Sequence, residues 1–583
     1  MAYVHYKFTT FQTTTGCDGR ESHPKGGSMK KTIRKGLALA AIAALSLSLT
    51  SVPAFASKKP AAKPKVTKKA TPVKPTVLRV TRMGDTSQAF GPTRNSSGND
   101  HFINFLLFSN LVKIAPDEKT ILPDLATKWA FSKDAKEITL ELRKGVTFHD
   151  GSQFTAADVA DTIGLACRLT TVNYIGYKPD RWLEVEGCAD LKDKETGIPS
   201  GVTVIDPYNI KVKLSKANAQ WVRYLTDAVY SIIPSEVHNG LLNKEWSISD
   251  FVVAEPIGTG PYTLTKFKRN QYMEFDVNPK YFGPKPSISK VFWLINVKPT
   301  NVLPLLQKNE LDLAIDIDVT NEEQVEKLAS HSATWNNTVA AQFLQFRVDH
   351  PVFGDKRVRQ AITYAFDRRS VLKNVFNGKG EIRWMYPAFD QDRGNLNKFE
   401  FNPDKAKALL KESGVDLKKE FTIVYSPLTD PAWPKIVPIL KQQLEDVGFN
   451  VKLDPVDQAA WAAATRVTDG AKSAYAMTLN SGGSLGLGTA RGSGFFNCKS
   501  PTFSWYSKCD IPDLYAKLFE ETDSKESDKL EDQLAKIIQD EVPFFTTWTK
   551  QTLNAVSKKL GGQFKLYPND RDSAMGITGW TIK

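Results

Sequence analysis

Few residues in this chain of 583 could carry out chemistry. His149 and Asp150 stand side by side, and an imidazole next to a carboxylate can act as a general acid–base pair. Asp150-Gly151 is above all a turn dipeptide, so we interpret both residues as part of a tight turn. The chain has only seven histidines, and no Ser/His/Asp, Cys/His or paired-carboxylate arrangement stands out. The sequence therefore predicts a protein that is not an enzyme and needs no cofactor.

The glycines of the run GTGPY, residues 258–262, could in principle cradle a phosphate. The lysine and the helix that complete a phosphate-binding loop do not follow them. We therefore interpret this run as a special backbone path that leads into a strand.

The cysteines offer a second kind of chemistry. Two close pairs occur, Cys167 with Cys188 and Cys498 with Cys509, and Cys17 lies apart from them. Neither spacing has the CxxC or CxxH form of a zinc site, so we expect no metal. In an exported protein these pairs predict two local disulfides, and four buried free thiols are the alternative.

An export signal begins at Met29. Four basic residues over positions 30–35 precede an apolar segment, residues 36–49, and a small-x-small cleavage pattern ends at Ala56. We predict a signal peptide over residues 29–56. Residues 1–28 would then be an upstream extension or a misassigned start. A permanent anchor is the alternative, but an apolar segment of about 14 residues is short for a membrane span.

The positive charge is confined to the N-terminal part of the sequence. The whole chain carries +13, and residues 1–76 alone carry +12, seven of them from lysines in residues 57–76. This Lys/Pro-rich stretch predicts an extended linker, which is either a simple spacer or a tether to anionic lipid or wall polymer. The rest is nearly neutral, so the general electrostatic footprint of a nucleic-acid partner is absent.

The stretch from Trp129 to Leu165 has the most consistent local signals. Apolar residues alternate over 138–142 as in a half-buried strand. Thr155 occupies the N-cap position of a helix, and Asp158 suits the positive end of that helix. We predict a strand, the Asp150 turn and a capped helix.

Further along, strand and helix patterns alternate. The sequence predicts a strand at 78–80, a helix at 104–112, a hairpin over 202–214, a helix at 403–414, a strand at 421–425, a helix around 436–447 and a strand at 451–453. A strand–helix–strand unit of this length favours parallel pairing, which indicates an α/β protein.

Four ordered segments resemble the signatures of one family. They are LRKGVTFHDGSQFTAADV (142–159), the stretch that contains GTGPY and NPKYFG (256–296), PVFGDKRVRQA (351–361) and VPFF (542–545). Together they are similar to family 5 of the extracellular solute-binding proteins, which serve peptide- and nickel-type ABC importers and include dipeptide- and oligopeptide-binding proteins.

The resemblance implies a two-lobed fold of the periplasmic-binding-protein type II (Venus-flytrap) class, with an extra subdomain in lobe one. The expected bounds are 77–112, 215–344 and 546–583 for lobe one, 113–214 for the inserted subdomain and 345–545 for lobe two. A ligand would bind in the interlobe cleft, and closure would create the surface that a permease recognises.

By the same resemblance, we expect a monomeric, extracytoplasmic protein that delivers a peptide or other small polar ligand to an ABC importer. Many such proteins carry a lipidated cysteine after the apolar segment, and this chain has none there. It would therefore be secreted and associated with the cell envelope by other means.

The ligand residues are expected mainly in lobe two. Peptide-binding relatives hold the ligand's amino group with an aspartate in a loop that aligns with residues 480–486, and this loop lacks the aspartate. A neutral polar ligand such as an oligosaccharide is therefore the alternative. The candidate ligand residues are Phe90, Asn99, Trp384, Tyr386, Trp461, Asn480, Ser481 and Trp548. For each of the aromatic residues, packing in a core is the competing interpretation.

Two other classes of function remain open at this point. A secreted glycan-active enzyme would need two facing carboxylates in the cleft. A wall-associated structural protein would show no ligand-dependent closure.

Overall fold

The computed structural model describes residues 75–83, 94–95, 98–117, 119–168, 175–176, 181–192, 196–235, 256–384, 395–427, 432–457, 460–461, 464, 475–482, 496, 508–568 and 570–583. All of them belong to one compact unit, Val73–Lys583. The predicted signal peptide and almost all of the predicted linker lie outside the described residues, as do Phe90, Tyr386 and Cys498.

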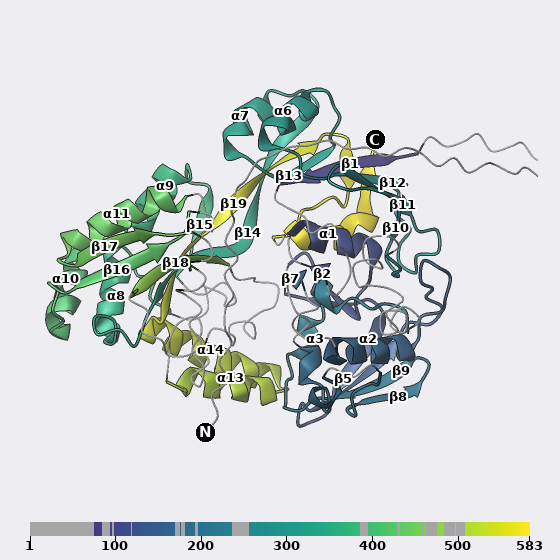
Figure 1. Ribbon diagram of the computed structural model, residues 1–583, viewed down its shortest axis with the longest axis horizontal. Coiled ribbons are helices and arrows are strands. Elements are labelled where there is room, and N and C mark those ends of the chain that lie inside the picture. The colour runs from purple at the N-terminus through teal and green to yellow at the C-terminus, as the bar shows by residue number, and fades with distance from the viewer. Residues whose placement is uncertain are drawn as a thin grey trace, which may run out of the picture. The chain divides into compact units, whose positions relative to one another are not determined.

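One large mixed sheet runs through this unit (Figure 1). Its strands, in spatial order, are β10 (Tyr262–Lys268), β11 (Tyr272–Val277), β12 (Lys290–Leu294), β1 (Val77–Arg82), β13 (Leu313–Ile317), β19 (Phe544–Ser557), β14 (His331–Phe346), β18 (Met477–Gly482), β16 (Glu420–Tyr425) and β17 (Asn450–Pro455), with β15 (Gly380–Ile382) against β19. β1 is parallel to both β12 and β13, and β16 is parallel to β17 and β18. The predicted α/β class is confirmed.

Two long strands connect the two halves of this sheet. β14 and β19 pair antiparallel from His331 opposite Ser557 to Gln345 opposite Phe544. β19 continues the sheet toward β13, and β14 continues it toward β18 (Figure 1). The chain therefore enters the half formed by β16–β18 along one strand and leaves it along the neighbouring one.

The helices complete the unit. They are α1 (Gly98–Leu107), α2 (Ala156–Arg168), α3 (Trp221–Tyr224), α6 (Pro299–Gln307), α7 (Glu322–Glu326), α8 (Lys356–Ala365), α9 (Arg368–Val375), α10 (Pro403–Ser413), α11 (Trp433–Asp446), α13 (Asp510–Glu520) and α14 (Ser524–Glu541), with 3-10 turns η2 (Trp182–Glu184), η3 (Ala189–Leu191), η4 (Ala228–Tyr230), η5 (Val319–Asn321) and η7 (Asp570–Gly579). The helix predicted over 104–112 is wrong in its bounds, because α1 ends at Leu107 and a strand, β3 (Val112–Ile114), follows.

The predicted α/β repeat is present in the β16–β17 half. Asn402 caps α10 by accepting a hydrogen bond from the main-chain N–H of Lys405, at 2.9 Å. Gly414 ends the helix in the left-handed conformation, with φ of +68°. β16 and β17 pair in parallel, as expected for strands joined by a helix. α8, α9, α10 and α11 share one hydrophobic core with these strands.

A separate four-stranded antiparallel sheet contains β5 (Ala126–Phe131), β6 (Glu137–Leu142), β9 (Asn209–Lys213) and β8 (Val202–Asp206). The smaller pairs are β3 with β4 (Ile121–Pro123), β2 (Arg94–Asn95) with β7 (Ile175–Gly176) and β20 (Leu560–Gly562) with β21 (Trp580–Ile582). The strand at 138–142 and the hairpin over 202–214 are confirmed. At the start of α2, the carboxylate of Asp158 accepts a hydrogen bond from the main-chain N–H of Thr155 at 2.8 Å. The capping bond is therefore made by the side chain of Asp158 to the main chain of the N-cap residue.

His149 and Asp150 have structural roles. Asp150 accepts from the N–H of Ser152 at 2.9 Å, and Gly151 has φ of +95°, as in a tight turn. The N–H of Gly258 donates to Nδ1 of His149 at 3.3 Å, and Nε2 lies 3.2 Å from the carbonyl oxygen of Gly260. Burial lowers the pKa of His149. The imidazole therefore fastens the GTGPY run to the turn.

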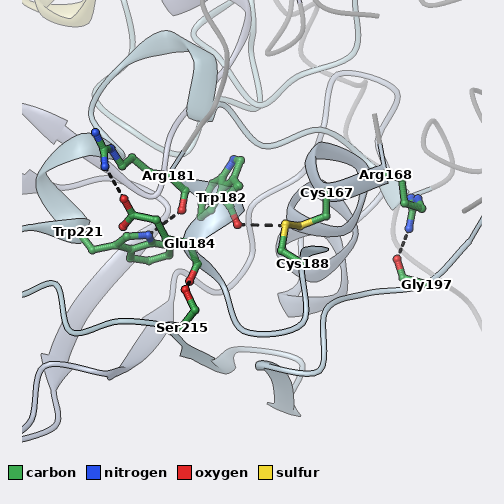
Figure 2. Close-up of a disulfide and its surroundings, with 9 residues drawn as sticks. All are labelled: Cys167, Arg168, Arg181, Trp182, Glu184, Cys188, Gly197, Ser215 and Trp221. Atoms are coloured by element: carbon green, nitrogen blue, oxygen red, sulfur yellow. Dashed lines mark hydrogen bonds and ion pairs between the residues drawn. A yellow bond between two sulfur atoms is a disulfide. The ribbon is translucent and has the colours of Figure 1, made fainter. Parts of the chain in front are cut away.

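The Cys167–Cys188 disulfide is present, as predicted. It joins the last turn of α2 to the residue before η3, with a Cα–Cα distance of 5.1 Å (Figure 2). Beside it, the ring of Trp182 contacts the ring of Trp221, with centroids 5.4 Å apart. Cys509 is also disulfide-bonded. Its predicted partner Cys498 lies outside the described residues, so this second pairing stays a prediction.

Candidate functional site

One face of the large sheet carries polar and aromatic side chains in register, and we call it the polar sheet face. Its residues form two rows across β18, β14 and β19, namely Asn480–Phe343–Thr546 and Thr478–Gln345–Phe544. Side chains alternate between the faces of a strand. Leu344, Leu479 and Phe545, which lie between these positions, accordingly belong to the core on the opposite face. Phe343 and Phe544 belong to a smaller core with α13 and α14. None of the six side chains is charged.

Trp461 is fixed to this face. Its indole Nε1 donates to the hydroxyl of Thr478 at 2.9 Å, and that hydroxyl donates to the carbonyl of Val424 at 2.8 Å. Trp461 is 5 % exposed. The structure therefore brings together two of the predicted ligand residues, Trp461 and Asn480, through neighbouring positions on β18.

Two buried polar side chains on this face lack partners in the described part of the chain. Gln345 is 1 % exposed, and neither its amide oxygen nor its amide nitrogen has a hydrogen bond there. The hydroxyl of Thr546 is in the same situation. Leaving such a group unsatisfied costs about 1–3 kcal/mol. Gln345 and Thr546 thus provide unused hydrogen-bonding capacity that water or a bound solute could fill.

Trp384 lies at a shallow hollow next to the polar sheet face. The hollow is open to solvent, has room for about one water molecule, and is lined by Trp384, Phe399, Phe544 and Thr546, among others. The ammonium of Lys398 lies 4.9 Å from the centre of the Trp384 ring. The structure thus places Trp384 beside residues of β19, two strands away from Asn480 on β18.

Trp548 lies on the other face of the sheet. It is 1 % exposed and packs against Phe366 and Phe376, with ring centroids 6.0 and 5.7 Å away. The structure therefore does not bring Trp548 together with Asn480, Trp461 and Trp384. For Ser481 only the main chain is described, and it pairs with Gln342.

Asn99 lies in the half of the sheet that contains β1. It begins the first turn of α1, is 2 % exposed, and its amide donates to the carbonyl of Arg82 at 3.5 Å. Arg82 is the last residue of β1, a strand with a parallel neighbour on each side. Ligands of α/β proteins bind near the carboxyl ends of such strands, so the position suits a ligand contact.

Gln345 and Thr546 were not among the ligand residues predicted from the sequence. The signal was a polar residue inside an apolar strand, QFLQF for Gln345 and PFFTTW for Thr546. A pattern of this kind indicates a polar group in a core, but it does not reveal which residues of other strands lie beside it.

Among the residues that the structure describes, no group of three or more His, Cys, Asp or Glu comes together in a way that could hold a metal ion. Nor does any helix within those ranges have the length and apolar character needed to cross a membrane.

Comparison with known proteins gives consistent matches. The profile of the bacterial extracellular solute-binding proteins, family 5 Middle, matches residues 120–489. The oligopeptide-binding protein AppA of Bacillus subtilis is 24 % identical over 494 residues, which cover 80 % of this chain and 84 % of AppA.

Two solved structures have the same fold. The ABC transporter substrate-binding protein CtaP of Listeria monocytogenes matches with a TM-score of 0.73 at 22 % identity, over 87 % of this chain and 99 % of CtaP. The structure of B. subtilis AppA in complex with a nonapeptide matches with a TM-score of 0.66 at 20 % identity, over 87 % of this chain and 99 % of AppA. The expected two-lobed fold is confirmed.

Proposed function

The chain belongs to family 5 of the bacterial extracellular solute-binding proteins, and from this premise we propose that it captures a peptide or another small polar solute between its two lobes and delivers it to the permease of an ABC importer. It is a solute-binding protein of ABC transporters and not an enzyme. The two lobes would correspond to residues 77–112, 215–344 and 546–583 for lobe one, with the inserted subdomain at 113–214, and residues 345–545 for lobe two.

The polar sheet face is the observation that carries the ligand proposal. Its hydrogen-bonding groups, on Asn480, Gln345 and Thr546, are all uncharged, and the indole of Trp461 lies beside them. Uncharged donors and acceptors suit the amide groups of a peptide main chain. We propose Asn480, Trp461 and Trp384 as ligand contacts from lobe two and Asn99 as one from lobe one. Phe90, Tyr386 and Ser481 stay predictions, and the position of Trp548 does not support a contact.

A peptide would be recognised here by its main chain more than by its terminal amine. The aspartate expected for that amine is missing from 480–486, where Asn480 and Ser481 stand instead. The same chemistry suits an oligosaccharide, because hydroxyl groups pair with amides and sugar rings stack on indoles. The oligosaccharide is therefore the second candidate.

A thermal-shift series separates these ligands, because a solute that binds only the native state raises its melting temperature. We expect Ala-Ala-Ala and its N-acetylated form to raise it similarly, and maltotriose to leave it unchanged. A shift with maltotriose alone would favour the oligosaccharide. A shift with the free-amine peptide alone would show that a carboxylate elsewhere replaces the missing aspartate.

The variant Asn480→Asp sharpens the same experiment. It places a carboxylate at the start of the loop that holds the amine in peptide-binding relatives. We expect it to favour Ala-Ala-Ala over the acetylated peptide by about tenfold, or about 1.4 kcal/mol. Asn374→Asp, a change on α9, is the control, and we expect it to leave the ratio of the affinities for the two peptides as in the wild type. An unchanged ratio in both variants would place the amine of the bound peptide away from residue 480.

For the location of the protein, we propose export through the signal peptide at residues 29–56 and retention near the envelope through the lysines of residues 57–76. This agrees with the extracellular location of the family. We further propose that the protein works as a monomer.

A further inference from the structure

The pairing around β19 is interrupted at one level, where β14 and β19 cross between the two halves of the large sheet. On one edge of β19, residues 338–340 of β14 all stand opposite Lys550. On the other edge, β15 pairs with residues 548–550 and β13 with 553–556, so that 551–552 lie between the two pairings. A strand bends where its ladder is disrupted. The sheet is therefore most easily bent at this level.

Three side chains meet beside this level, and we call them the crossing cluster: Glu322 on α7, Trp335 on β14 and Lys379, the residue before β15. The indole Nε1 of Trp335 donates to Oε1 of Glu322 at 2.6 Å. The ammonium of Lys379 lies 3.1 Å from the same Oε1 and 4.5 Å from the centre of the Trp335 ring. The carbonyl of Lys379 accepts a hydrogen bond from the N–H of Gln551 at 3.4 Å. The cluster is thus attached to the interrupted level itself.

The crossing cluster joins segments that lie on the two sides of the crossing. Glu322 and Trp335 belong to the proposed lobe one, whereas Lys379 belongs to the proposed lobe two. The side chains of Lys379 and Glu322 are 35 % and 33 % exposed. The hydrogen bond from Trp335, together with the charge of Lys379, lowers the pKa of Glu322, so its carboxylate is charged at neutral pH. Lys379 therefore contacts lobe one through an anion and an aromatic ring at once, which stabilises more than an exposed ion pair alone.

A second contact joins the proposed lobe two to the rest of the chain at another place. The N–H of Ala219 donates to the carbonyl of Phe519, near the end of α13, at 2.6 Å. In the arrangement of this structure, lobe two thus meets the rest of the chain both at the crossing and away from it. A solute that contacts both lobes favours an arrangement in which the lobes meet. The crossing cluster and the solute would therefore favour the same arrangement.

We propose that the crossing cluster is a latch, which stabilises the arrangement in which the lobes meet and thereby strengthens binding of the solute. The proposal rests on the proposed function, because the lobes and the solute are part of it. None of the three side chains touches the solute in this proposal, so the latch acts only through the population of the binding arrangement. The apparent affinity of a ligand falls in proportion to that population.

The test reverses one charge. Lys379→Glu places a second carboxylate beside Glu322. The matched control Lys327→Glu does the same beside Glu323, because Glu323 and Lys327 form an ion pair at 2.5 Å within the proposed lobe one. We expect Lys379→Glu to bind Ala-Ala-Ala about fivefold more weakly at low ionic strength, and this loss should shrink in high salt, which screens exposed charges. We expect the control to keep the wild-type affinity.

Exchanging the two charges provides a rescue. The double variant Glu322→Lys with Lys379→Glu restores an ion pair at the same place, and we expect it to bind Ala-Ala-Ala within about twofold of the wild type. Damage to the fold around residue 379 would not be repaired by a second substitution on α7. The rescue therefore separates the charge interaction between the lobes from a general loss of stability.

X-ray scattering of the ligand-free protein supplies a readout that needs no solute. We expect the radius of gyration to increase in Lys379→Glu and to keep the wild-type value in Lys327→Glu and in the exchanged pair. If the wild type binds neither Ala-Ala-Ala, nor its N-acetylated form, nor maltotriose, the proposed function fails. The scattering then decides alone whether the crossing cluster holds the lobes.

An unchanged radius of gyration in Lys379→Glu overturns the proposal. So does a wild-type or higher affinity of this variant for Ala-Ala-Ala where the wild type binds that peptide. An exchanged pair that binds as weakly as Lys379→Glu also overturns it, because the loss would not come from the charges. If Lys379→Glu does not fold, Lys379→Met decides by the same two measurements with Lys327→Met as its control, since both substitutions only remove a charge.

Discussion

At the scale of single residues, buried charges in this protein are held largely by backbone groups. Arg359 on α8 is 1 % exposed and donates to the carbonyl groups of Phe353, Gly354, Glu541 and Val542, as well as to the carboxylate of Glu541 at 3.2 Å. Carbonyl dipoles spread a positive charge over several groups, and this fixes the main-chain segments that supply them. The buried carboxylate of Asp124, by contrast, has only one main-chain donor in the described part of the chain.

Asp124 is 7 % exposed and accepts one main-chain hydrogen bond, from Asn110 at 3.3 Å. Burial raises its pKa to about 6, although the charges of Lys113 and Arg143 act in the opposite direction. Asp124 and Tyr281 both line a second hollow, separate from the one at Trp384. Because the folded pKa lies above the unfolded value of about 3.9, the folded state gains stability as the pH falls through 6 and loses it above.

We therefore predict that Asp124→Asn is more stable than the wild type at pH 7.5, by up to about 3 kcal/mol, the equivalent of two pKa units. The advantage should shrink steadily toward pH 4.5. Urea unfolding of both proteins between pH 4.5 and 8 measures it. A stability difference that does not change with pH would mean that Asp124 titrates normally in the folded protein.

At the scale of elements, close backbone contacts fix how the GTGPY run meets α1. The main chain of Gly260 donates to the carbonyl of Leu107 at 3.0 Å. A Cβ atom at Gly260 would lie 2.5 Å from the carbonyl oxygen of Leu106, closer than atoms can approach. The signature glycines are thus needed for packing, and His149 fixes the run from the other side.

We predict that Gly260→Ala lowers the free energy of unfolding by several kcal/mol, in the range of other severe steric changes in a core (about 3–5 kcal/mol). The control is Gly354→Ala, since a Cβ there would meet its nearest atoms at an ordinary 3.7 Å. The control should cost less than about 1 kcal/mol, because nothing is displaced. Chemical denaturation measures both variants, and equal losses of unfolding free energy in the two would contradict the steric explanation.

The Cys167–Cys188 disulfide is the second feature at this scale. It closes a loop with a sequence separation of 21 residues in which Trp182 is fully buried. We predict that the double variant Cys167→Ser and Cys188→Ser loses about 2–4 kcal/mol of unfolding free energy. Wild-type protein under native conditions should leave both residues unlabelled by a thiol reagent. Labelling of either one without reductant would show that the bond is not formed in the isolated protein.

At the scale of the whole molecule, one contact joins two cores that are otherwise built from distant parts of the sequence. The carbonyl of Phe519, near the end of α13, accepts from the N–H of Ala219 at 2.6 Å. The ring of Phe519 packs against the core around α2 and also against the core of α13 and α14. In Figure 1, α13 lies beside the elements that follow β9. This contact would join the predicted inserted subdomain to the predicted lobe two.

We predict that Phe519→Ala favours separation of these parts. The radius of gyration measured by X-ray scattering should increase, and the affinity for a ligand bound between the lobes should fall by about three- to tenfold, as expected for losing a half-buried ring (about 1 kcal/mol). Leu514→Ala is the control, because Leu514 packs only against the core of α13 and α14. Identical scattering from both variants would argue that the contact does not restrain the lobes.

Local signals in the sequence predicted local structure well. The cap at Asn402, the stop at Gly414 and the turn at Asp150 each depend on neighbours within a few residues, and all three are confirmed. The composition of the polar sheet face depends on pairing between residues far apart, such as Phe343 with Asn480 and with Thr546. No periodicity within one strand contains that information.

Trp548 illustrates the same limit. Trp548 was predicted as a ligand residue because it stands in the segment that returns from lobe two to lobe one. In the structure, however, the pairing of β14 with β19 shifts register between Gln342 and Phe343. Such a shift changes the face on which the following side chains lie. In the structure Trp548 belongs to the core shared by α8, α9 and α11, which the sequence alone did not reveal.

One core has a consequence for the timing of folding. Leu78 and Val80 of β1 share it with Ile577 and Trp580, which are fully buried. This core cannot close until residue 580 has been synthesised, roughly 25–100 s after β1 at ordinary rates of translation. During that interval β1 can pair with β12 and β13, but the core that it shares with Ile577 and Trp580 stays incomplete. For the export that we propose, this delay would leave the nascent chain incompletely folded during passage through a secretion channel, and the core would close on the far side of the membrane.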